Sequence, residues 1–169
     1  MIALAATRLQ PAPYRPPAFV AHGSLRVAAI GETDFEAAAK YLSRDSMMEA
    51  IVQRAEHCSR PLTLTLNAHD DDSFDPNTDT VHWDPHSALQ TTLGGTQTPA
   101  LGLGHELDHA TVAPALEEKG SGRYIAGYDN AEERRVITGS EAHAALTLGE
   151  GLRYDHAGTS YRVHSPTER

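Results

Sequence analysis

The 169-residue sequence contains one cysteine, Cys58, and few aromatic residues. A single cysteine cannot form an intramolecular disulfide, so the fold does not depend on oxidation. Phe, Trp and Tyr make up 6% of the chain, which predicts a core of small and aliphatic side chains. The sequence also lacks a run of about 18 apolar residues, the length that spans a bilayer. We therefore expect no membrane partner.

Basic residues are scarce. The chain has 14 Lys and Arg against 23 Asp and Glu, giving a formal net charge of −9. Nucleic-acid-binding domains carry a basic surface, so we expect no nucleic-acid partner. The length is typical of one domain, and a monomer is expected.

The first 21 residues begin with a short apolar stretch and continue with several prolines and arginines. A secretory signal peptide has a different order, in which a basic segment precedes the apolar one and a cleavage site follows. We interpret residues 1–21 as a flexible, proline-rich leader. Residues 22–165 are then expected to form a single domain.

The most informative segment is residues 98–110, TPALGLGHELDHA. Thr98 suits an N-cap and Pro99 suits the first helical position, so a helix is predicted to begin here. His105 and His109 are four residues apart and leave the same helix face, where both can bind one metal ion. Glu106 lies about 100° around the helix from His105, which suits a general base acting on water beside the metal. The His-Glu-x-x-His pattern therefore predicts a zinc hydrolase site.

A catalytic zinc usually has three protein ligands, so two histidines need a partner. A glutamate on a later helix is the commonest solution, which favours Glu132 or Glu133. The wider set of downstream candidates is Asp129, Glu132, Glu133, Glu141 and His143. The simpler alternative is that the histidines are ordinary residues of an amphipathic helix, and that residues 132–135 form a solvated charged face.

Elsewhere, periodicity and turn residues predict an α+β fold. Strands are expected at 24–30, 62–66 and 80–84, and the last of these at the sheet edge beside the substrate cleft, by analogy with zincins. One long helix capped by Thr33 is expected to run to Cys58. The acidic segment 67–77 is interpreted as a solvated turn and 117–127 as a surface excursion. Asn130 is expected to cap a helix ending at Gly139, before a helix at 140–148 and a hairpin of 152–155 with 160–163.

Four blocks in order resemble one family. They are the Asp84–Pro85 pair after the Trp83 strand, and residues 100–110, 130–141 and 149–158. Together they resemble the NleD-type and XopG-type zinc metalloprotease effectors, which bacteria inject by type III secretion. The resemblance covers residues 74–163.

The resemblance implies a zincin-like (gluzincin-like) minimal metalloprotease in which a small sheet packs on the metal-binding helix. It implies His105 and His109 as zinc ligands, Glu106 as the base, and Glu133 as third ligand with Glu132 as fallback. Arg153 or His156 would donate to the oxyanion. The substrate would be a host protein, a MAP kinase for the effectors of animal pathogens, and the leader would serve as the secretion signal.

Two functions follow as hypotheses. The first is a zinc-dependent endopeptidase, made in the bacterial cytoplasm and acting inside a host cell. The alternative is a zinc-stabilised, catalytically silent module that binds a host protein. An acidic adaptor with fortuitous histidines is a third possibility, which predicts no stoichiometric zinc.

Overall fold

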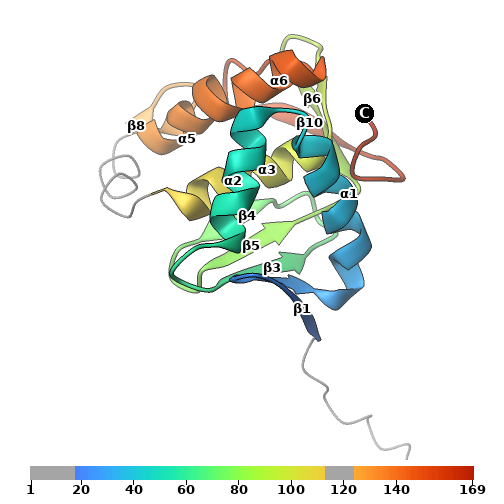
Figure 1. The fold of residues 1–169 in the computed structure, drawn as a ribbon. Helices are drawn as coiled ribbons and strands as arrows, with labels where there is room; N and C mark the ends of the chain where they lie inside the picture. Colours follow the sequence, from blue (N-terminus) through green and yellow to red (C-terminus); the bar gives the residue numbers. More distant parts are fainter. Residues whose placement is uncertain (1–17, 113–123) are drawn as a thin grey trace, which may run out of the picture.

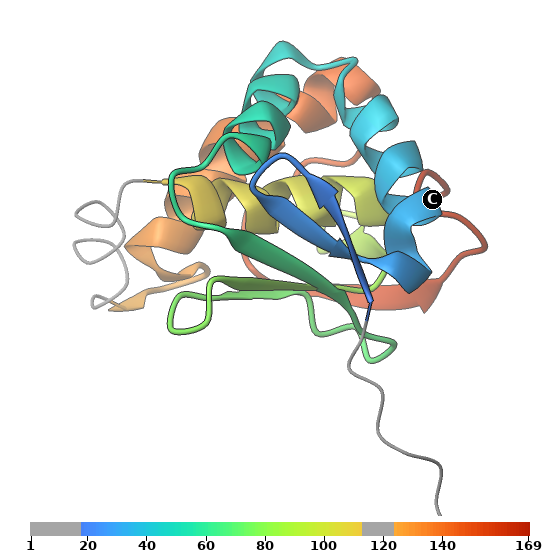
Figure 2. The ribbon, with the colours of Figure 1, turned by 60° about the horizontal axis from the view of Figure 1, so that its bottom comes forward.

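The computed structural model describes residues 18–112 and 124–169. Its largest sheet has the order β1-β2-β3-β5-β4, and the helices lie on one side of it (Figures 1 and 2). The inner strands β2, β3 and β5 are parallel, whereas the edge strands β1 and β4 are antiparallel to their neighbours. The strands are β1 (Phe19–His22), β2 (Leu25–Ala28), β3 (Leu62–Leu66), β4 (Ser73–Asp75) and β5 (Thr80–Trp83). The α+β class predicted from the sequence is confirmed.

Alternation along the strands explains which face the helices cover. Leu62 and Leu64 of β3 are fully buried, whereas Thr63 and Thr65 point to the other face. The structure differs from the prediction about the edge, because β5 lies between β3 and β4 and its Trp83 is fully buried. The edge is instead β4, inside the segment that was expected to be a turn.

Two helices stand where one was predicted between Thr33 and Cys58. Helix α1 (Glu32–Leu42) and helix α2 (Ser46–Glu56) are separated by a break. The Asp45 side chain accepts hydrogen bonds from the backbone N–H of Met47 and Met48, both at 3.0 Å, and so starts a new helix. Helix α1 follows Gly31 and a short 3-10 turn (Ala29–Gly31), so Thr33 lies inside it and does not cap it.

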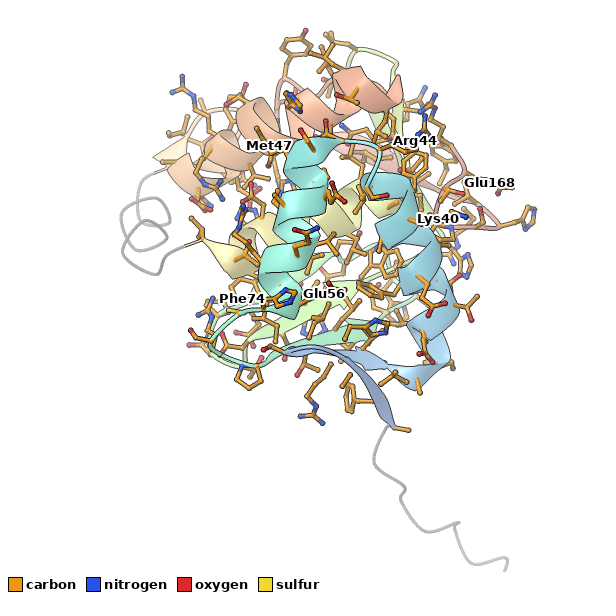
Figure 3. All side chains as sticks on the ribbon, in the orientation of Figure 1. Lys40, Arg44, Met47, Glu56, Phe74 and Glu168 are labelled. Atoms are coloured by element: carbon orange, nitrogen blue, oxygen red, sulfur yellow. The ribbon has the colours of Figure 1, made fainter. Side chains whose placement is uncertain are left out.

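Helix α3 (Pro99–Thr111) packs against α1, α2 and β5. Side chains fill the space between this helix layer and the sheet, whereas Lys40, Arg44 and Met47 are exposed on the outer side of α1, α2 and their connection (Figure 3). Trp83 joins the two layers, since its Nε1 donates to the carbonyl of Pro99 at 2.8 Å. The start of α3 is therefore fixed to the sheet.

A second sheet has the order β10-β6-β7. Strand β10 (Gly158–Arg162) pairs with β6 (Ser87–Thr91), and β6 pairs with β7 (Thr96–Gln97). The predicted hairpin of 152–155 with 160–163 is therefore wrong. The partner of β10 comes from a distant part of the chain, and local turn signals do not reveal such a pairing.

The last helical region follows a small hairpin of β8 (Tyr124–Ile125) and β9 (Asp129–Asn130). Helix α5 (Ala131–Val136), a π-helical segment η2 (Ile137–Glu141) and helix α6 (Ala142–Leu148) follow one another without a break. Asn130 caps α5 as predicted. Gly139 lies inside η2, so the predicted end there is wrong. The helix ends at Gly149, whose φ of 71° favours glycine.

Residues 1–17 of the predicted leader lie outside the described residues, and β1 begins at Phe19. Most of the predicted surface excursion, residues 117–123, also lies outside them. Among the residues that the structure describes, no helix has the length and apolar character needed to cross a membrane.

Candidate metal centre

Helix α3 starts as the sequence predicts. Thr98 Oγ1 accepts a hydrogen bond from the Leu101 N–H at 3.2 Å, and Pro99 occupies the first turn. The Thr98 N–H donates to the buried carboxylate of Glu150 at 2.6 Å. Gly104 allows α2 to approach, because a Cβ there would lie 2.6 Å from Met48 Sδ. These contacts fix the rotation of α3, and with it the direction of its histidines.

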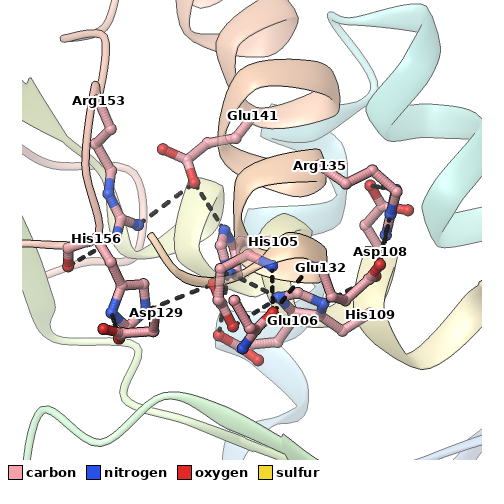
Figure 4. A network of polar contacts seen from close by, with 12 residues as sticks. His105, Glu106, Asp108, His109, Asp129, Glu132, Arg135, Glu141, Arg153 and His156 are labelled. Carbon is pink, nitrogen blue, oxygen red and sulfur yellow. Dashed lines mark hydrogen bonds and ion pairs between the residues drawn. The ribbon is translucent and has the colours of Figure 1, made fainter. Parts of the chain in front are cut away.

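His105, His109 and Glu133 converge on one point. Figure 4 shows the two histidines there, with Glu106 and Glu132 close by. The two Nε2 atoms are 3.0 Å apart. Glu133 Oε2 lies 3.1 Å from His105 Nε2, and Glu133 Oε1 lies 3.3 Å from His109 Nε2. A tetrahedral ion with bonds of about 2.0–2.1 Å has ligand atoms roughly 3.3 Å apart. This buried group could therefore hold a metal ion.

The other nitrogen of each imidazole is bound by a different carboxylate. His105 Nδ1 lies 2.7 Å from Glu141 Oε2, and His109 Nδ1 lies 3.2 Å from Glu132 Oε1. Such carboxylate partners fix the ring orientation and leave Nε2 free for a metal. The structure thus separates the two adjacent glutamates, placing Glu133 at the centre and Glu132 behind His109.

Behind Glu132 lies a further ion-pair network. Arg135 Nη2 donates to Glu132 Oε1 at 2.6 Å, and its Nη1 donates to Asp108 Oδ2 at 3.0 Å. The Ser140 hydroxyl also donates to Asp108. Residues 132–135 are therefore not simply a solvated charged face, since among them only Arg134 is exposed.

The charges around the histidines favour a buried cation. Burial alone would lower the pKa of His105, but hydrogen bonds to Glu133 and Glu141 outweigh it and raise the pKa to about 10. The pKa of His109 is also raised, because the bonds to Glu132 and Glu133 outweigh its burial. Four carboxylates surround two imidazoles, and so much negative charge is stable in a buried place only when positive charge balances it.

Glu106 stands beside the centre but outside the ligand set. Its Oε1 is 3.9 Å from His105 Nε2, and burial raises the pKa of its carboxyl. Two cavities meet at this side chain, one of about 250 Å³ against β6 and β10 and one of about 330 Å³ beside β4. The residues that border both cavities are Asp72, Glu106 and His156.

His156 also lies beside the group formed by His105, His109 and Glu133. Its Nε2 lies 3.5 Å from Glu133 Oε2, and its Nδ1 lies 2.8 Å from Asp129 Oδ2. Asp129 adopts a left-handed backbone with φ of 63°, which aspartate tolerates better than most residues. The candidate ligand Asp129 thus holds His156 and is not part of the converging group.

The other candidates are not part of the converging group. Arg153 points at Glu141, with Nη1 to Oε2 at 3.4 Å, and its remaining donors bind backbone carbonyls. His143 pairs with Asp45 at 2.8 Å, at the start of α2 and away from His105 and His109.

Asp72 also borders the site, although it lies in the segment 67–77 that the sequence predicts to be a solvated turn. Its Oδ1 accepts the Asp84 N–H at 2.6 Å, and burial, aided by the charges of Glu106 and Asp84, raises its pKa to about 7. A Cβ on Gly102 would lie 3.0 Å from Asp72 Oδ2, so this glycine gives the carboxyl room beside α3. Nothing in a run of three aspartates singles out the third.

Comparison of the chain with protein-family models, curated proteins and solved structures gave no match. The resemblance to injected metalloproteases therefore stays a prediction from the sequence.

Proposed function

We propose that this protein is a zinc-dependent endopeptidase with a zincin-like (gluzincin-like) fold. The observation that carries the proposal is the convergence of His105 Nε2, His109 Nε2 and the Glu133 carboxylate beside Glu106, where two cavities meet. Two imidazoles and one carboxylate are a donor set that suits zinc and is too rich in nitrogen for calcium or magnesium.

Zinc bound there would supply Lewis-acid polarisation and lower the pKa of water. Glu106 takes the proton from the attacking water and later gives it to the leaving amine. Burial raises the pKa of the Glu106 carboxyl, which makes it a better proton acceptor than an exposed glutamate.

His156 suits the oxyanion better than Arg153 does. Asp129 fixes its Nδ1, so its Nε2 points toward His105, His109 and Glu133. Arg153 instead donates to Glu141 and to two carbonyls of its own loop.

The edge strand β4 supports peptide binding. Among the described strands it pairs with β5 alone, so its outer edge is open for an extended chain. Ser73 and Phe74 of β4 line one of the two cavities, and the other continues past Glu106 toward β6. Space on both sides of Glu106 favours cleavage within a chain over cleavage at its end.

The test uses Glu106→Gln, with Glu49→Gln on the exposed side of α2 as the control for charge. Zinc content and cleavage of a library of quenched fluorescent peptides are measured for both variants and for the parent protein. We expect one zinc per chain in all three, and a loss of turnover of about 10²–10⁴-fold in Glu106→Gln alone. Zinc without cleavage in the parent protein would support the silent binding module instead.

The host-protein substrate, including a MAP kinase, and delivery by type III secretion remain proposals that rest on the sequence resemblance alone.

A further inference from the structure

Glu141 contacts three groups that belong to different parts of the site. Its Oε2 lies 2.7 Å from His105 Nδ1 and 3.4 Å from Arg153 Nη1. Its Oε1 accepts a hydrogen bond from Gln97 Nε2 at 2.8 Å. The residue is 1% exposed, so these contacts account for its charge. We infer that Glu141 and Arg153 form a positioning bridge, which joins the metal ligand His105 to the loop that carries His156.

Arg153 completes the bridge through the backbone. Its Nη2 donates to the carbonyl of His156 at 3.1 Å and its Nε to the carbonyl of Asp155 at 3.4 Å. The Arg153 side chain is 11% exposed. The guanidinium therefore donates to a carboxylate on one side and to two successive backbone carbonyls on the other. Such an arrangement restrains the loop. Arg153 therefore acts on the His156 ring by holding the peptide groups around it.

The π-helical segment η2 gives Glu141 its direction. In a regular α-helix, residues eight apart differ by about 80° in direction after two turns, so Glu133 and Glu141 would diverge. One π-turn of about 4.4 residues and one α-turn of about 3.6 residues together make eight residues. With η2 in place, both glutamates leave the same helix face two turns apart. They then reach opposite nitrogens of His105.

The second oxygen of Glu141 is held by β7. Besides donating to Glu141, Gln97 Nε2 donates to the Gly151 carbonyl at 2.9 Å, and the Gly151 N–H donates to the Thr96 carbonyl at 2.9 Å. Gly95 and Gly151 touch, since a Cβ on Gly151 would lie 2.6 Å from Gly95 Cα. This close approach brings Gln97 within reach of Glu141.

A glutamine would be a poor replacement for the carboxylate of Glu141. In Glu141→Gln one end of the side chain is an NH₂ group, which must face either Gln97 Nε2 or the His105 side. The variant also removes the charge that favours an Nδ1–H on His105. Loss of such a carboxylate typically weakens metal binding about 10–100-fold.

The experiment compares Glu141→Gln and Arg153→Met with the Glu49→Gln control. Zinc affinity is measured by competition with a chromophoric chelator, and the His105 tautomer by ¹H–¹⁵N NMR of the imidazoles. We expect Glu141→Gln to bind zinc about 10–100-fold more weakly and to lose the Nδ1–H signature. Arg153→Met should keep its zinc affinity and shift the His156 ring signals.

Kinetics at saturating zinc test the coupling. This part rests on the proposed function. We expect Arg153→Met to lower kcat with little change in KM, because His156 acts in the transition state. The kcat of the double variant should be little lower than that of Glu141→Gln alone, since both changes break the same bridge.

A zinc affinity of Glu141→Gln equal to that of the parent protein would overturn the inference, as would fully additive losses in the double variant. If Glu141→Gln does not fold, deletion of Gly139 takes its place, because it removes the extra residue and turns Glu141 away. Gly139→Ala is its control, since nothing lies within 4 Å of a Cβ there. The zinc and NMR results stand even if no peptide is cleaved, so failure of the proposed function is distinguishable.

Discussion

Helix α3 is buried on two sides by different partners. Toward α1, α2 and the sheet it presents Leu103, Leu107 and Ala110, each fully buried in the hydrophobic core. Toward α5 and η2 it presents His105, Asp108 and His109, also buried but bound to carboxylates, an arginine and a serine. The same helix thus joins an apolar core to a charged one.

The two sides of α3 differ in what happens when one side chain is removed. On the apolar side a truncated residue leaves a cavity, and the cost stays local. On the charged side every group balances another, so removal of one leaves its partners buried without compensation. Substitutions on the apolar side of α3 should therefore affect mainly stability, whereas substitutions on the charged side should affect metal binding.

The largest difference in zinc occupancy is expected between the variants His109→Ala and Leu107→Ala. Loss of one of three ligands should abolish stoichiometric zinc, measured by elemental analysis after dialysis. Leu107→Ala should lower the free energy of unfolding by about 2–5 kcal/mol, measured by denaturant titration, and still bind one zinc. Full zinc occupancy in His109→Ala would disprove the ligand assignment.

A smaller effect is expected from the adjacent pair Arg135→Met and Arg134→Met. Arg135 joins Glu132 to Asp108, so its loss should cost about 1–3 kcal/mol of unfolding free energy and weaken zinc binding through His109. Arg134 is exposed, and its replacement should change stability by less than about 0.5 kcal/mol. Equal effects in the two variants would show that the network behind Glu132 contributes nothing.

A further effect concerns the pH dependence of the metal-free protein. Burial raises the pKa of Asp72 from its ordinary value of 3.8 to about 7 in the folded state. Between these values the folded state binds more protons, so this residue lowers the stability as pH rises from about 4 to 7. In Asp72→Asn this contribution disappears, and the variant should gain stability relative to the parent at pH 8. Thermal unfolding from pH 4 to 8 measures it, and parallel curves would contradict it.

The sequence predicted α3 well because its signals are local. Thr98, Pro99 and the spacing of His105 and His109 all lie within 13 residues, and the α-helical repeat alone puts both imidazoles on one face. Glu133 was chosen over Glu132 by resemblance, and periodicity could not separate two adjacent residues. The structure separates them by the imidazole nitrogen that each one meets.

The failures have two physical origins. The break at Asp45 comes from a local N-cap, which helical periodicity alone does not reveal. Other failures come from contacts between distant segments. The pairing of β10 with β6 joins segments about 70 residues apart. Glu141 was named only as a candidate ligand, and its contact with His105 depends on η2, which joins two helices that the sequence predicts as separate.

The contact between Gly95 and Gly151 carries a consequence for how such a protein can diverge. Each glycine excludes a side chain at the other, so neither position can accept a larger residue unless the β7 strand moves. We expect natural variants to keep glycine at both positions while Gly139, which faces open space, drifts freely. This constraint comes from backbone packing and is independent of the histidines.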